Sequence, residues 1–196
     1  MQKSSFVRAL VAGVLTIAVV TQVPAQGKGG DARKKLIERG KFLVNLGGCN
    51  HCHTPKVMGP KGPVDDETHL LAGSPAGQPV PEIPAEHMGP GKWGALLSMD
   101  FTIWAGPWGV SFTRNLTSDK ETGLGSWTDA VFIKAMRTGK DMGEGRPILP
   151  PMPWEDIGKL PDADLKAMFA YLQSVPPVKN AIHDPIPPPG APGGGH

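Results

Sequence analysis

The pentapeptide Cys49-Asn50-His51-Cys52-His53 brings together the residues of this chain best suited to chemistry. Two thiols three positions apart can each add across a vinyl group of a haem, and the histidine that follows can then bind the iron. A C-x-x-C-H pattern is typical of c-type haem attachment. The chain has no other cysteine, so no thiol remains for a disulfide or a zinc cage. The sequence therefore predicts one haem c, covalently bound through Cys49 and Cys52 and ligated by His53.

An iron held by His53 needs a second axial ligand, and a methionine thioether is a common choice in electron-carrying haem proteins. Met152 lies within residues 150–154, Pro-Pro-Met-Pro-Trp, where the proline rings fix the backbone and remove its donors. A stiff segment suits a side chain that must stay at one place on a haem face, so we predict that Met152 completes the coordination. We also expect a backbone carbonyl near Pro55 or Pro60 to hold the other ring nitrogen of His53.

The other methionines are weaker candidates for this ligand. Met58 is too close to the haem motif to reach the opposite face easily, and Met136 and Met168 lie at core spacing within expected helices. Met99 and Met142 remain as alternatives.

Three segments show helical periodicity and would position these ligands. Apolar or small residues recur at three- and four-residue spacing along residues 32–46, which end at a Gly-Gly pair just before the haem motif. A second helix is expected over residues 127–138, with Ser126 as its N-cap and Gly139 at its end. Residues 162–174 have acids in the first turn and prolines after the last. No run alternates convincingly as a strand, so we expect an all-α helical bundle around the haem.

The N-terminus has the layout of an export signal. Lys3 and Arg8 precede an apolar run over residues 9–20, and small residues near Ala25 offer a cleavage site. The run is shorter than the roughly 20 residues that a membrane-spanning helix needs. We therefore expect a signal peptide over residues 1–25, cleaved near Ala25, and export to the periplasm. An uncleaved membrane anchor is the alternative.

Charge argues against nucleic acid as a partner. The formal net charge of +2 includes the two basic residues of the expected signal peptide, so the remaining chain is close to neutral and has no basic block.

Further segments follow the haem motif and its Thr54-Pro55 in a recognisable order. They are Asn-Leu-Thr-Ser-Asp at 115–119, Glu-Thr-Gly-Leu-Gly-Ser-Trp at 121–127, Pro-Met-Pro-Trp at 151–154, and Ala-Tyr-Leu at 170–172 before Pro-Pro-Val at 176–178. Together they resemble class I c-type cytochromes with a single haem. They are similar in particular to the haem domains of cytochrome subunits of periplasmic alcohol and sugar-acid dehydrogenases.

The resemblance implies a cytochrome c domain over residues 31–179 in which the first and last helices cross beside the haem. It also implies Met152 as the sixth ligand. Asn115, Thr117 and Trp127 would contact the haem edge, and the indole N–H of Trp127 would reach a propionate.

Two features depart from those dehydrogenase subunits. They usually carry several C-x-x-C-H sites, whereas this chain has one. Residues 60–108 also form a long Pro/Gly-rich loop insertion, in which we expect Trp93, Trp104 and Trp108 to line the haem pocket. Residues 180–196, rich in Pro and Gly, are expected to form a disordered tail.

A six-coordinate iron has no open position for oxygen or substrate. We therefore expect an electron carrier rather than an enzyme, cycling one haem between Fe(II) and Fe(III) with redox proteins as donor and acceptor. It would work alone or as the electron-transfer subunit of a larger dehydrogenase. Association with a membrane, through a partner or an uncleaved leader, stays open.

Two other interpretations stay open. If Met152 does not bind, a five-coordinate haem would suit an enzyme or a gas sensor. Without haem, Cys49 and Cys52 would act as a redox dithiol or bind zinc with His51 and His53.

Overall fold

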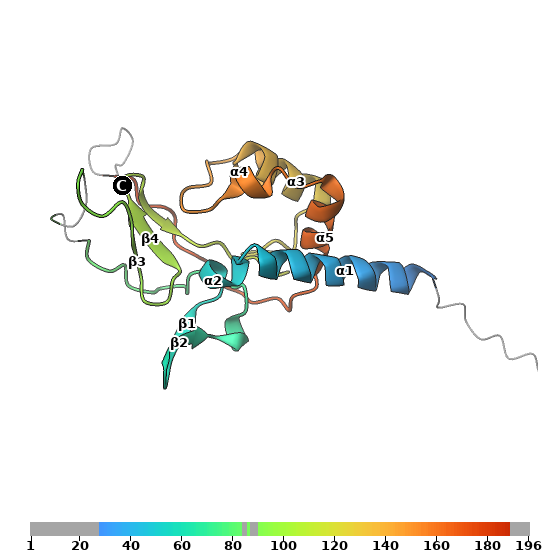
Figure 1. The fold of residues 1–196 in the computed structure, drawn as a ribbon, viewed down its shortest axis with the longest axis horizontal. Coiled ribbons are helices and arrows are strands. Elements are labelled where there is room, and N and C mark those ends of the chain that lie inside the picture. The colour runs from blue at the N-terminus through green and yellow to red at the C-terminus, as the bar shows by residue number, and fades with distance from the viewer. Residues whose placement is uncertain (1–27, 84–85, 87–89, 189–196) are drawn as a thin grey trace, which may run out of the picture.

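The computed structural model of the 196-residue chain describes residues 28–83, 86 and 90–188, so the expected signal peptide and its cleavage site lie outside the described residues. The helices are α1 (Lys28–Leu46), α2 (Cys49–His53), α3 (Asp129–Thr138), α4 (Trp154–Ile157) and α5 (Asp162–Leu172), with 3₁₀ turns η1 (Glu67–His69) and η3 (Asp141–Gly143). Figure 1 shows α1 and α2 running across the view with α3 and α4 above them and α5 beside α1. None of the described helices is long and apolar enough to cross a membrane.

Two small antiparallel sheets contradict the expected all-α fold. Strands β1 (Lys56–Gly59) and β2 (Gly62–Asp65) form a hairpin, and β3 (Leu96–Leu97), β4 (Ile103–Gly106) and β5 (Gly109–Phe112) form a three-stranded sheet in that order. The chain is therefore a mixed α/β protein. The strands are only two to four residues long, too short for period-two alternation to stand out against the Pro/Gly-rich sequence around them.

The turns of the β1–β2 and β4–β5 hairpins share a Gly-Pro-x-Gly pattern. Gly59-Pro60-Lys61-Gly62 joins β1 to β2, Gly106-Pro107-Trp108-Gly109 joins β4 to β5, and the outer glycines of each turn pair directly. Gly62 and Gly109 have φ of 121° and 93°, a backbone conformation that residues with a side chain rarely adopt. Proline at the second position and glycine at the fourth are both preferred in β-turns.

Helix α1 is held by a close crossing with α5. Gly40, Leu43 and Val44 form its buried face, and Gly40 lies so near the Ala167 backbone that a β-carbon there would overlap the carbonyl oxygen. At the edge of the crossing, Arg39 Nε donates to Asp164 Oδ1 at 2.9 Å. The first and last helices therefore cross, as the resemblance implies.

Helix α3 begins two residues later than expected. Its N-cap is Thr128, not Ser126, and the Thr128 hydroxyl accepts a hydrogen bond from the backbone N–H of Val131 at 3.2 Å. Gly139 ends the helix in the left-handed conformation, with φ of 64°, as expected. The helix packs on α5 through Phe132 and Phe169, whose ring centroids lie 5.5 Å apart.

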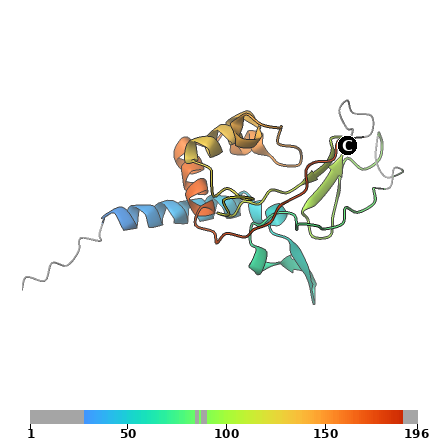
Figure 2. The ribbon, with the colours of Figure 1, turned by 180° about the vertical axis from the view of Figure 1, so that it is seen from behind.

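The segment after α5 runs back along the molecule to the three-stranded sheet, as Figure 2 shows in red. Asn180 Nδ2 donates to the carbonyl oxygens of Ala72 and Ser74 at 2.7 and 2.8 Å, and the backbone of Ile186 pairs with that of Val110. Residues 180–188, which the sequence assigned to a disordered tail, therefore lie against the body of the protein. Residues 189–196 lie outside the described part.

The α1–α5 crossing predicts opposite effects for two glycines of one helix. Gly40→Ala should lower the free energy of unfolding by about 1–3 kcal/mol, because the helices must separate to admit the methyl group. Gly30→Ala should raise it by up to about 1 kcal/mol, since nothing lies within 4 Å and alanine favours helix. Thermal unfolding of the haem-loaded protein measures both, and equal effects would contradict the close crossing.

Candidate functional site

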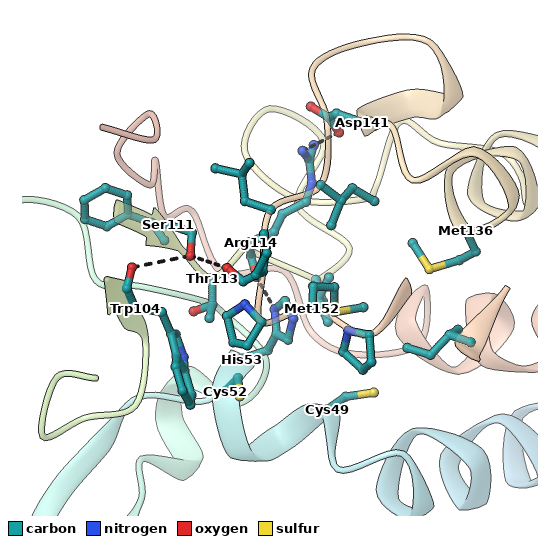
Figure 3. A pocket seen from close by; sticks show the side chains of 18 of the residues that line it. Cys49, Cys52, His53, Trp104, Ser111, Thr113, Arg114, Met136, Asp141 and Met152 are labelled. Atoms are coloured by element: carbon teal, nitrogen blue, oxygen red, sulfur yellow. Dashed lines mark hydrogen bonds and ion pairs between the residues drawn. The ribbon is translucent and has the colours of Figure 1, made fainter. Parts of the chain in front are cut away.

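A largely apolar pocket opens between α2, the β4–β5 hairpin and residues 146–153. Its empty space is about 1300 Å³ when the open mouth is counted. Figure 3 shows it with side chains from these elements converging on it. An open pocket with a largely apolar lining suits an apolar ligand.

Helix α2 places the two thiols and the imidazole on one wall. Gly48, with φ of 66°, turns the chain sharply from α1 into α2. Cys49 and Cys52 are three residues apart and so lie on one face of the helix, and both line the pocket together with His53 (Figure 3).

The imidazole of His53 is held in one orientation. It is buried, and its Nδ1 donates to the backbone carbonyl oxygen of Arg114 at 2.7 Å. Because a carbonyl can only accept, the proton sits on Nδ1 and Nε2 is left with a free lone pair. Burial lowers the pKa of His53, which also favours the neutral ring that a metal needs.

The expected acceptor near Pro55 or Pro60 is therefore wrong. Arg114 lies 61 residues from His53 in the sequence, so no local pattern could reveal the pair. Two backbone hydrogen bonds bring the segments together through residues 71–74: Gly73 N–H to His53 O at 2.8 Å, and Ser74 N–H to Thr113 O at 2.9 Å. Gly73 has φ of 79°, and a β-carbon there would strike the backbone of residues 113–114.

Met152 lines the same pocket from residues 146–153. Its segment is tied to the sheet, because the Ser111 hydroxyl donates to the carbonyl oxygen of Pro150 at 2.7 Å. Of the other methionines, Met136 on α3 also lines the pocket. Met99 and Met142 do not, and their exposed fractions are 70% and 53%.

Of the three residues expected at the haem edge, one lines the pocket and two do not. Trp127 lines the pocket, whereas Asn115 and Thr117 do not. Asn115 is fully buried, and its amide nitrogen donates to Thr122 Oγ1 and to the carbonyl oxygen of Val178 at 3.1 and 2.8 Å. Its amide oxygen accepts from the N–H and hydroxyl of Thr117. Asn115 and Thr117 thus hold the loop behind the pocket wall.

Among the tryptophans of the insertion, Trp104 alone lines the pocket. Trp93 is 65% exposed, and the indole N–H of Trp108 donates to Ser111 Oγ at 3.3 Å. The β4–β5 hairpin nevertheless supplies a whole wall, since Ser111 and Phe112 line the pocket beside Trp104. Sequence reasoning missed this wall, although the Gly-Pro-x-Gly turn at 106–109 marks the hairpin.

The two thiols lack the properties of a redox dithiol. Burial raises the pKa of Cys49 to about 11 and also raises the pKa of Cys52, whereas reactive cysteines have lowered values. No cluster of three or more His, Cys, Asp or Glu side chains able to hold a metal ion is present in the described part of the chain. Neither haem-free interpretation is supported.

The residues of the pocket fit a haem c. Thiols, imidazole and thioether face an apolar space, and the lining residue Arg114 has a buried Nε–H without an acceptor among the described residues. A carboxylate at the haem periphery would supply that acceptor.

Comparison with known proteins decides the family. The sequence model of the family described as cytochrome c matches residues 37–176. The chain belongs to the cytochrome c family. A protein of this family holds haem c, and its role is electron transfer rather than catalysis, as the sequence predicted.

Similar proteins include parts of dehydrogenases. The cytochrome is 32% identical over 144 residues to a nicotinate dehydrogenase subunit of Pseudomonas putida, a match that covers 74% of this chain and 9% of the relative. It is 30% identical over 177 residues to the gluconate 2-dehydrogenase cytochrome c subunit of Pantoea cypripedii, covering 90% and 30%. The alcohol dehydrogenase (quinone) cytochrome c subunit of Gluconobacter oxydans is 29% identical over 151 residues, covering 76% and 23%. The cytochrome spans less than a third of the length of each of these relatives.

Replacing each of the two methionines that line the pocket should have a different effect on the haem spectrum. Met152→Leu keeps the side-chain volume but removes the sulfur, so the ferrous cytochrome should lose its low-spin spectrum and bind carbon monoxide readily. Met136→Leu, the matched control, should remain low-spin and exclude carbon monoxide. The change in packing should cost less than about 1.5 kcal/mol of stability in each variant, and Met152→Leu loses the bond to iron in addition. An unchanged low-spin spectrum of Met152→Leu would place the sixth ligand elsewhere.

Proposed function

We propose that this cytochrome is a periplasmic one-electron carrier with a single haem, attached through Cys49 and Cys52 and ligated by His53 and Met152. The observation that carries the proposal is the convergence of both ligand side chains on one apolar pocket, from elements about 100 residues apart in sequence. When bound, the haem supplies the Fe(II)/Fe(III) couple.

The protein's own residues fix the ligands before and after electron transfer. The hydrogen bond to Arg114 holds the His53 ring, and the Ser111 hydroxyl holds the carbonyl of Pro150 two residues before Met152. Side chains that stay in place in both redox states keep the geometry change small, which favours rapid electron exchange. The β4–β5 wall and Trp127 limit the access of water to the pocket.

The partners of such a carrier are an electron-donating and an electron-accepting redox protein. Two of the relatives described above are named as cytochrome c subunits of dehydrogenases, which supports a role beside a dehydrogenase, as a subunit or as a separate carrier. Weak and small interfaces are typical of redox encounters. Co-purification from periplasmic extract, with the membrane fraction examined in parallel, would separate a free carrier from a bound subunit.

Export and attachment are tested together on protein recovered from the periplasm. We expect a mass increase of one haem per chain, loss of residues 1–25, no thiol open to alkylation, and reduction by one electron. A Cys49→Ser, Cys52→Ser variant should be exported without covalent haem. Recovery of colourless wild-type protein with two free thiols would contradict the proposal, and rapid carbon monoxide binding by the wild type would favour an enzyme or sensor.

A further inference from the structure

We propose that the side chain of Arg114 is a positioning residue for the axial imidazole, an inference that rests on the proposed ligation by His53. The carbonyl oxygen that receives the Nδ1–H of His53 belongs to Arg114 itself. The position of that carbonyl therefore depends on how the rest of the residue is held.

Two contacts clamp the guanidinium group of Arg114. Its Nη1 donates to Asp141 Oδ1 at 2.6 Å, and its Cζ lies 4.9 Å from the centroid of the Trp127 ring. The side chains of Arg114 and Asp141 are 29% and 27% exposed, so water screens their ion pair less than a surface pair. Stacking on an aromatic face adds a cation–π attraction that needs the planar guanidinium. Figure 3 shows the arginine extending from beside His53 to Asp141.

The clamp joins the carbonyl to a separate part of the fold. Trp127 lies just before α3, and Asp141 lies in η3 just after it. The backbone around Asp141 is itself fixed, because its N–H donates to the carbonyl oxygen of Arg146 at 2.9 Å and its carbonyl accepts from Gly145 at 2.7 Å. Both ends of α3 thus restrain the residue whose carbonyl orients His53.

The strength of the His53 hydrogen bond has an electronic consequence. A ring that donates firmly through Nδ1 is a more basic ligand through Nε2, which stabilises Fe(III) relative to Fe(II). A looser bond should therefore raise the reduction potential and open Nδ1–H to exchange with solvent. A purely structural arginine, or one acting only by its charge, would move neither quantity when the charge is kept. An arginine acting only through its Nε–H on a haem carboxylate would change the potential but leave the exchange of the His53 Nδ1–H unchanged.

The test is Arg114→Lys in the haem-loaded protein, after a low-spin spectrum has shown that both axial ligands are bound. Lysine keeps the positive charge but loses the planar stack and the forked N–H groups. In the reduced state, NMR should show exchange of the His53 Nδ1–H accelerated about five-fold or more, the effect of losing about 1 kcal/mol of restraint. The reduction potential should rise. Asp141→Asn, which keeps the arginine and removes its ionic partner, should accelerate the same exchange.

The matched control is Arg137→Lys. Arg137 on α3 forms a comparable ion pair, Nη2 to Asp162 Oδ1 at 2.7 Å, but it does not line the pocket. In Arg137→Lys, the exchange rate of the His53 Nδ1–H and the reduction potential should equal those of the wild type. Wild-type exchange in Arg114→Lys, or equal acceleration in Arg137→Lys, would overturn the inference. A high-spin spectrum of the wild type would instead refute the proposed ligation, which keeps the two failures distinct.

Discussion

The site depends on one hydrogen bond, from Nδ1 of His53 to the carbonyl oxygen of Arg114. It fixes the tautomer, so the free nitrogen that faces the pocket is the one a metal can use. The bond exists because residues 71–74 lie between the two segments and pair with both. Gly73 makes this possible, since a side chain there would separate the backbones. The five-residue haem motif therefore depends on two segments that follow it in the sequence, residues 71–74 and residues 113–114.

The long insertion also helps to build the pocket. Residues 60–108 include strands β2, β3 and β4, and Trp104 of β4 lines the pocket. Ser111 of the adjoining strand β5 holds the segment that bears Met152. The segment after α5 then crosses back and pairs with β5, so the chain beyond the last helix supports the same wall. The sheet is thus part of the cofactor site, and α2 and α3 supply other parts of its lining.

Part of this structure could be predicted from local patterns in the sequence. The haem motif and the Gly139 stop depend on spacing alone and lie where expected. Helices α1 and α5 were also predicted, although α1 begins at Lys28 rather than at residue 32 and α5 ends at Leu172 rather than at residue 174. The strands were missed because each is two to four residues long, although Gly-Pro-x-Gly at 59–62 and 106–109 was a readable turn signal. The carbonyl of Arg114 and the contacts of Asn115 could not be predicted for another reason. What each side chain or carbonyl contacts is decided by segments far away in the sequence.

The central claim is that the protein saturates both axial positions of one haem iron with a fixed imidazole and a fixed thioether. X-ray absorption at the iron edge, on exported protein in each oxidation state, measures this directly. The account predicts six ligands including one sulfur, with the same set in Fe(II) and Fe(III). A five-coordinate iron, or a first shell without sulfur, would contradict it.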